Sequence, residues 1–186
     1  STFLVNSEIR KKIKKIKKIS KVLDIKKQNN IIKKLEFSLT NDQMKTLSEI
    51  NKDLGSSNKM FRLLQGDVGS GKTIVSLLSA YNSVNSGFQV AVMAPTEILA
   101  RQHFTLAKKI FPKNLKVEII SGKSDYKNKK IILNKLLNHE IDIIFGTHAI
   151  FQKKVNFKKL GLIIIDEQHK FGVNQRKKLS DKGGDN

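Results

Sequence analysis

From about residue 61 onward, the apolar positions of the chain form short continuous runs that alternate with helical patterns. Continuous apolar runs predict strands that are buried on both faces, and helices between them predict crossover connections. The predicted strands are residues 61–65, 89–94, 116–120, 141–145 and 161–166, and the predicted helices are residues 72–86, 97–110 and 127–138. The pattern therefore predicts an α/β domain with a mainly parallel sheet flanked by helices on both faces.

The first 36 residues follow a different pattern, in which apolar residues recur every three or four positions between lysines. The recurring residues are Ile9, Ile13, Ile16, Ile19 and Leu23. Their spacing predicts a basic amphipathic helix, whose apolar stripe we expect to pack against the neighbouring domain, with DNA or a membrane surface as alternatives. The polar residues 28–30 are predicted to interrupt this helix, and a second short turn leads to Phe37.

A separate helix is predicted between the basic segment and the first strand. Thr40 or Asn41 is its expected N-cap, and Gly55 marks its expected end. The apolar residues on one face of this helix are Leu47, Ile50 and Leu54.

The composition excludes several classes of protein. The 186 residues suffice for one domain with a well-buried core, and the absence of cysteine excludes a disulfide scaffold or a thiolate metal site. The four histidines are too scattered for a zinc cluster, so Mg²⁺ is the metal to consider. There is no apolar run long enough to span a bilayer and no signal peptide, so we expect a soluble, cytosolic protein without a membrane partner.

The net charge of +20, from 36 Lys and Arg against 16 Asp and Glu, suits a partner with a phosphate backbone. However, a chain that is rich in Lys, Ile and Asn, with only four Arg, is also what an A+T-rich coding sequence produces whatever the function. Nucleic-acid binding must therefore be argued from motifs.

The segment LLQGDVGSGKT contains the pattern G-x-x-x-x-G-K-[ST], after a predicted strand and before a predicted helix. Glycines let successive N–H groups converge on one anion, and the following helix presents its positive end. We expect Lys72 to neutralise the β- and γ-phosphates and Thr73 to bind Mg²⁺. The residues predicted to hold the nucleotide are Gly66, Asp67, Val68, Gly69, Ser70, Gly71, Lys72 and Thr73.

A carboxylate for the metal is predicted at the end of the last strand. Asp166 follows four apolar residues and would emerge at the carboxyl end of its strand, where ligands bind in open α/β sheets. We expect Asp166 to bind Mg²⁺ and Glu167 to be the base that orients the attacking water. A strand that ends in Asp-Glu is a weak signal alone, but beside the phosphate loop it completes one site. The predicted catalytic residues are Lys72, Asp166 and Glu167.

The segments MAPTEILARQH and FGTHAIFQ place small polar residues where predicted strands end. Thr96 follows one strand, and Thr147 and His148 follow another. Free N–H groups at helix starts can grip a sugar-phosphate backbone without reading bases. Both segments could equally be plain capping boxes, and the residues alone leave these alternatives open.

In this order, the segments resemble the first motor domain of a superfamily 2 helicase, and more narrowly the RecG family of branched-DNA helicases. The resemblance runs from about residue 37 to the C-terminus, in FSLTNDQ, LLQGDVGSGKT, MAPTEILARQH, FGTHAIFQ and LGLIIIDEQHKFGVNQR. The transcription-repair coupling factor is similar but usually has Asp-Glu-Glu-His where this chain has Asp166, Glu167, Gln168 and His169.

The resemblance implies a RecA-like P-loop domain at residues 37–186, preceded at residues 1–36 by a basic helical connector from a wedge domain. It implies ATP as the nucleotide, with Gln43 recognising adenine, and it implies that Gln168 and His169 link the γ-phosphate to DNA contacts. The residues implied to lie along the DNA path are Thr96, Arg101, Thr147 and His148. The alternatives are a solvated Gln43, a surface charge at Arg101 and a packed turn histidine at His169.

RecG-like helicases also need the wedge domain and a second RecA-like domain with an arginine finger, and this chain carries neither. We therefore expect a C-terminally truncated, monomeric motor fragment from the bacterial cytosol that binds Mg-ATP, hydrolyses it poorly and cannot unwind DNA alone. The implied role of the full helicase is in recombination and replication-fork repair. The alternatives are a non-catalytic module that binds nucleotide and nucleic acid, or a translocase like the coupling factor.

Overall fold

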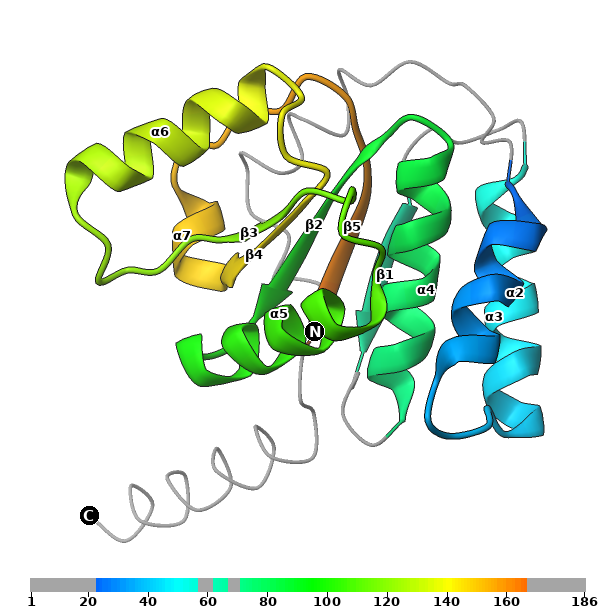
Figure 1. Ribbon diagram of the computed structural model, residues 1–186. Coiled ribbons are helices and arrows are strands. Elements are labelled where there is room, and N and C mark those ends of the chain that lie inside the picture. Colours follow the sequence, from blue (N-terminus) through cyan, green and yellow to red (C-terminus); the bar gives the residue numbers. More distant parts are fainter. Residues whose placement is uncertain (1–22, 57–61, 67–70, 167–186) are drawn as a thin grey trace, which may run out of the picture.

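The computed structural model describes residues 23–56, 62–66 and 71–166. Its helices are α2 (Ile25–Lys34), α3 (Asn41–Leu54), α4 (Lys72–Asn85), α5 (Glu97–Ile110), α6 (Tyr126–Leu137) and α7 (His148–Gln152). Its strands are β1 (Arg62–Gly66), β2 (Gln89–Ala94), β3 (Val117–Ile119), β4 (Ile143–Thr147) and β5 (Leu160–Asp166). From β1 to β5, strands and helices alternate along the chain (Figure 1), as the apolar runs predict.

The five strands form one sheet in the order β1-β5-β2-β4-β3, and each neighbouring pair is parallel. The last strand, β5, is inserted between β1 and β2 (Figure 1). Both β2 and β5 are buried along their whole length, which explains their continuous apolar sequences. The predicted α/β class with a mainly parallel sheet is confirmed. The edge strand β3 is shorter than predicted, and β4 begins at Ile143 rather than at residue 141.

Helices cover both faces of the sheet and bury two separate apolar clusters. On one face, α4 and α5 pack over a cluster that includes Val90 and Val92 of β2. On the other face, α6 and α7 contribute to a cluster that includes Ala91 and Met93 of the same strand. Successive residues of β2 therefore enter opposite clusters, as the pleat of a strand requires.

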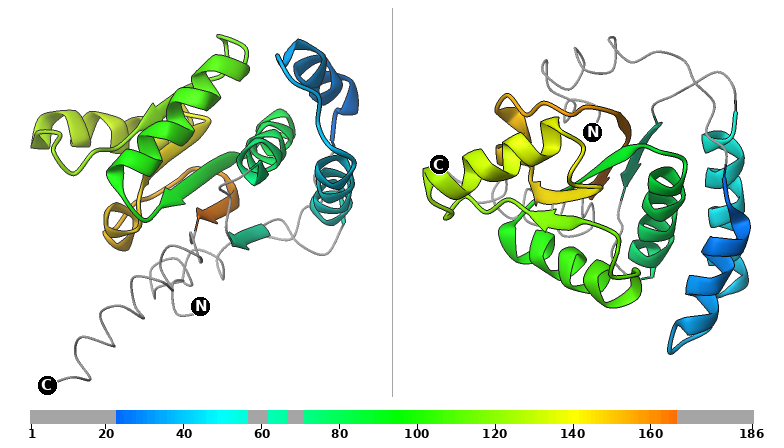
Figure 2. Two further views of the ribbon diagram at one scale, coloured as in Figure 1. Left: turned by 90° about the horizontal axis from the view of Figure 1, so that it is seen from below. Right: turned by 45° about the horizontal axis from the view of Figure 1, so that its top comes forward.

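α2 and α3 lie beside α4, on its side away from the sheet (Figures 1 and 2). Ile31 of α2 and Leu47 and Leu54 of α3 are buried in the same apolar cluster as α4. The predicted helix with Thr40 as N-cap and its end at Gly55 is confirmed. The apolar stripe of the basic segment was expected to pack against the neighbouring domain, and Leu23 does lie against this cluster. The rest of the stripe, from residue 9 to residue 19, is outside the described residues.

The prediction that residues 28–30 interrupt the helix is wrong, because α2 runs through them. Gln28 is buried, and its Oε1 accepts hydrogen bonds from Nδ2 of Asn51 and from Nδ2 of Asn82, both at 2.7 Å. Nδ2 of Asn82 also lies 2.8 Å from Oδ1 of Asn51. Gln28 is thus part of an amide cluster with Asn51 and Asn82, which joins α2, α3 and α4. Its hydrogen bonds offset the cost of burying its amide group.

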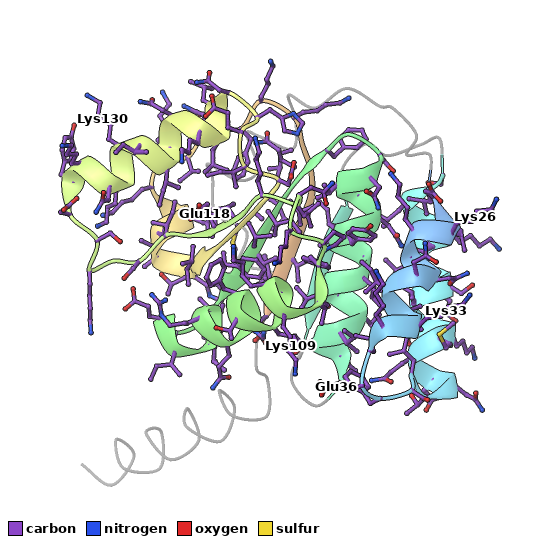
Figure 3. All side chains as sticks on the ribbon, viewed as in Figure 1. Lys26, Lys33, Glu36, Lys109, Glu118 and Lys130 are labelled. Atoms are coloured by element: carbon purple, nitrogen blue, oxygen red, sulfur yellow. The ribbon has the colours of Figure 1, made fainter. Side chains whose placement is uncertain are left out.

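Lysine side chains lie on the outer surface of α2. Lys26 and Lys33 project from the side of α2 that faces away from the sheet (Figure 3). Lys109 of α5 lies 3.6 Å from the carboxylate of Glu36, but both side chains are exposed, so this ion pair contributes little to stability. Across the described ranges, no helix is both long and apolar enough to cross a membrane.

Candidate nucleotide site

Two neighbouring strands end side by side at the carboxyl edge of the sheet. The register of β1 with β5 places Gly66 opposite Asp166. Gly66 opens the phosphate-loop pattern, and Asp166 closes the apolar run of β5. The predicted placement of this carboxylate beside the phosphate loop is confirmed by the register, because β5 is inserted next to β1. The roles assigned to these residues stay predictions.

The phosphate-loop pattern ends where α4 begins. Gly71 is the N-cap residue of α4 and has a left-handed backbone with φ +85°, a conformation that L side chains rarely adopt. No side chain among the described residues caps this helix. Lys72 is exposed and Thr73 is half-buried in the first turn. A helix start without a side-chain cap suits an external anion, because its first N–H groups carry partial positive charge.

Gln43 connects α3 to the start of α4. Its Oε1 accepts a hydrogen bond from the N–H of Thr40 (2.8 Å), and its Nε2 donates one to the carbonyl of Gly71 (2.7 Å). The hydroxyl of Thr40 accepts from the N–H of Gln43 (3.1 Å), which completes a capping box. The side chain of Gln43 is half-buried, and both of its amide atoms are hydrogen-bonded within the chain. Its recognition of adenine stays a prediction.

Asp166 is completely buried, and its Oδ2 lies 2.8 Å from Nε2 of His103 on α5. The histidine is itself only 6% exposed. A carboxylate in an apolar interior needs a hydrogen-bonding partner of this kind. His103 is not among the predicted site residues. The signal that could have found it is its position between Ala100 and Ala107 on the buried face of α5.

Thr96 and Thr147 both cap helices. The hydroxyl of Thr96 accepts from the N–H of Leu99 (3.2 Å) at the start of α5, and that of Thr147 accepts from the N–H of Ile150 (3.4 Å) at the start of α7. Neither is a reciprocal capping box, because the third helical residue is Leu99 or Ile150 rather than Glu or Gln. The contacts support a capping role for both threonines, and their contact with DNA stays a prediction.

Glu97 joins the first turn of α5 to the loop after β3. Its Oε1 accepts hydrogen bonds from the hydroxyl of Ser121 and from the N–H of Gly122 (2.9 Å). The Ser121 hydrogen bond is the main cause that holds the pKa of this carboxyl below its ordinary value. Gly122, Lys123 and Arg101 add to the effect, and desolvation opposes it. Glu97, Arg101 and Lys123 line a groove of about 630 Å³ along α5, in which Arg101 is exposed.

Several predicted site residues cannot be placed. Asp67, Val68, Gly69, Ser70, Glu167, Gln168 and His169 lie outside the described residues. His148 is half-buried and is the first residue of α7.

The described residues contain no group of three or more His, Cys, Asp or Glu that could hold a metal ion by itself. Mg²⁺ is usually bound by one or two protein oxygens together with phosphates and water. The carboxylate of Asp166, at the strand end beside the phosphate loop, is a donor of this type, and the hydroxyl of Thr73 lies in the first turn that follows the loop. The residues therefore fit a metal that is shared with a nucleotide.

Comparison with known proteins supports the interpretation of this site as a nucleotide site. The model of the DEAD/DEAH box helicase family matches residues 40–183, a span that includes the phosphate loop, Gln43 and Asp166. The chain belongs to the DEAD/DEAH box helicase family. ATP binding is a property of this helicase domain, and the predicted RecA-like fold agrees with the family.

The relatives of this helicase chain include several bacterial proteins named ATP-dependent DNA helicase RecG. The chain is 50% identical over 149 residues to the protein of Streptococcus pneumoniae serotype 4, covering 80% of this chain and 22% of the relative. It is 50% identical over 155 residues to that of Bacillus subtilis, covering 83% and 23%. It is 46% identical over 181 residues to that of Thermotoga maritima, covering 97% and 23%. The chain thus spans less than a quarter of the length of these relatives.

A solved structure of RecG bound to a three-way DNA junction is also similar to this helicase domain. The two superpose with a TM-score of 0.70 at 36% identity, over 88% of this chain and 26% of that chain. The RecG resemblance drawn from the motifs is therefore confirmed for the fold and for most of the chain.

Proposed function

We propose that this chain is the first motor domain of a RecG-like, ATP-dependent DNA helicase that acts on branched DNA. The observation that carries the proposal is the register of Gly66 opposite Asp166 at the strand ends, together with the start of α4, which no described side chain caps. This register brings Gly66, the first residue of the phosphate-loop pattern, and Asp166, the first residue of the acidic motif, to one edge of the sheet. The identity to RecG proteins, which extends over 80% to 97% of the chain, supports the substrate class.

In this proposal the chain binds ATP together with Mg²⁺. Lys72 neutralises the β- and γ-phosphates, Thr73 and Asp166 hold the metal, and Glu167 orients the attacking water. The bound metal would neutralise charge that develops on the transferred phosphate. Gln43 would recognise adenine while it keeps its bonds to the helix starts, because its Nε2 has a second N–H and its Oε1 a second lone pair.

The proposed DNA path follows the helix starts beyond the nucleotide. Its residues are Thr96, Arg101, Thr147 and His148, and Gln168 and His169 link the γ-phosphate to these DNA contacts. We further propose that residues 37–186 form this motor domain, that residues 1–36 connect it to a wedge domain, and that a second motor domain closes the ATP site in the full-length monomer. The short span of the RecG relatives that this chain covers supports this division. A DNA substrate would place the helicase in the bacterial cytosol.

The test compares Mg·ATP binding by the wild-type chain and by Lys72→Ala, using titration calorimetry. Loss of the ammonium should lower the affinity at least roughly tenfold, because charge-assisted hydrogen bonds to the phosphates are lost. Lys130→Ala is the matched control, since it removes the same charge from α6, on the opposite face of the sheet from α4 (Figure 3). Equal binding by wild type and Lys72→Ala would overturn the nucleotide site.

A second measurement tests the helicase assignment. ATP turnover is followed with no DNA, with linear duplex and with a forked DNA, for this chain and for a longer chain that includes a second motor domain. We expect negligible turnover by the short chain and turnover by the longer chain that forked DNA stimulates most. A longer chain that binds nucleotide but shows no turnover with any DNA would favour a non-catalytic binding module.

A further inference from the structure

His103 contacts the proposed metal-binding carboxylate from a different element of the fold. It lies on α5, near the middle of the helix, and its Nε2 is 2.8 Å from Oδ2 of Asp166 at the end of β5. The exposed fractions are 6% for His103 and 0% for Asp166, so bulk water does not compete for this contact. Helix α5 therefore supplies a hydrogen-bonding partner to the carboxylate at the end of β5.

The chemistry of the two groups sets the direction of the hydrogen bond. An ionised carboxylate has acceptors and no donor, so Nε2 of His103 carries the hydrogen that lies between them. A bond between a buried carboxylate and a side chain fixed in a packed helix restricts the rotation of the carboxylate. Partners of this kind are known to hold metal-ligating groups in the orientation that the metal needs.

We propose that His103 is a positioning residue that fixes the orientation of Asp166 for Mg²⁺ binding. This inference rests on the proposed nucleotide site and adds to it a residue from α5. The histidine does not contact the metal or the nucleotide in this proposal. It acts only through the carboxylate, by keeping Oδ2 in one place. The same helix also carries Thr96 and Arg101, so the residue that positions the carboxylate is on the element proposed to meet DNA.

The experiment measures ATP affinity by calorimetry with Mg²⁺ and with EDTA for the wild type, His103→Leu and His103→Gln. Leucine has a similar size and no N–H, whereas glutamine offers an N–H to the carboxylate. Mg²⁺ raises ATP affinity by some factor in the wild type, and we expect this factor to be roughly 10 to 100 times smaller in His103→Leu. The ATP affinity without metal should be the same in both. His103→Gln should restore most of the wild-type factor. His139→Gln, at the end of α6, is the histidine control and should match the wild type.

Thermal unfolding of each variant separates positioning from packing. If His103→Leu unfolds more easily but keeps the wild-type dependence on Mg²⁺, the histidine is structural and the inference is wrong. If the leucine variant does not fold, His103→Asn replaces it, because its amide is shorter and does not reach the carboxylate. Equal Mg²⁺ dependence of the Asn and Gln variants would then overturn the inference.

The outcome for the wild type distinguishes failure of this inference from failure of the proposed function. A wild-type chain that does not bind ATP in either condition removes the nucleotide site, and the positioning role with it. A wild-type chain that binds Mg·ATP through Lys72 while His103→Leu behaves identically removes only the positioning role.

Discussion

Helices α4 and α5 both begin near the carboxyl end of a strand, but their first turns are built differently. α5 starts from Thr96, whose hydroxyl caps the helix, and Glu97 adds a carboxylate that bridges to the next loop. α4 starts from the left-handed Gly71, and no side chain in the described part of the chain caps it. The N–H groups of a capped start are partly satisfied by the chain, whereas an uncapped start needs a partner from outside. This contrast is the one expected between a structural helix start and the ligand-binding helix start that we propose for α4.

The largest effect on this contrast should come from Gly71→Ala. A Cβ at this position would lie 2.8 Å from Nε2 of Gln43, and the residue would be held at φ +85°. The left-handed conformation costs an L residue about 1–2 kcal/mol, so the start of α4 should shift and weaken the bond to Gln43. We expect Mg·ATP affinity to fall about five- to thirtyfold, measured by calorimetry.

The control for this substitution is Gly122→Ala. A Cβ there meets no atom within 4 Å, and the N–H that Gly122 donates to Glu97 is kept. Its ATP affinity and unfolding temperature should match the wild type. Unchanged ATP affinity in Gly71→Ala would show that the left-handed start of α4 does not serve the nucleotide.

A smaller effect, on stability but not on ATP affinity, is expected from Thr96→Ala. Loss of the N-cap hydroxyl should lower the free energy of unfolding by about 1 kcal/mol, measured by urea denaturation, and should leave ATP affinity unchanged. Thr96→Ser keeps the hydroxyl and should restore stability. If the free energy of unfolding of Thr96→Ala equals that of the wild type, the hydroxyl does not stabilise the start of α5, and the contrast between the two helix starts is wrong whatever happens to DNA affinity.

The smallest effect is a pH-dependent one at Glu97. The folded-state pKa of this carboxyl lies below its ordinary value of 4.5, mainly because Ser121 donates a hydrogen bond to it. Its stabilising contribution is therefore full above the ordinary value and is lost as the pH falls through the folded-state pKa. Glu97→Gln should have a slightly lower unfolding temperature than the wild type at neutral pH and the same one in strong acid. A difference that is constant with pH would mean that the charge of Glu97 does not contribute.

The sheet, and the strand and helix on either side of the phosphate-loop pattern, could be predicted from the sequence because their signals are local. The apolar run before Asp166 is long enough only for a buried strand. The glycine spacing before Lys72 indicates a phosphate loop because a predicted strand precedes it and a predicted helix follows it. The predicted strand ends differ from the observed ones, since β4 starts at Ile143 instead of at residue 141. The edge strand β3 is also shorter than its apolar pattern predicts, because it pairs with its single neighbour β4 only from Val117 to Ile119.

The contacts of Gln28 and His103 could not be predicted because their partners are far away in the sequence. Gln28 is polar, and without knowledge of Asn51 and Asn82 a polar residue in an apolar stripe indicates a break. His103 contacts a carboxylate that is 63 residues away, so no spacing rule connects the two. Gln43 is an intermediate case, since its capping box with Thr40 is local and its bond to Gly71 is not.

The amide cluster of Gln28, Asn51 and Asn82 has a mechanical consequence. The hydrogen bonds of this cluster, at 2.7 Å and 2.8 Å, can form in only one register of the three helices. A shift of α2 by one turn would leave buried amides without their partners, at a cost of about 1–3 kcal/mol for each group. The cluster therefore fixes the register of α2 against α4, the helix that begins at Lys72.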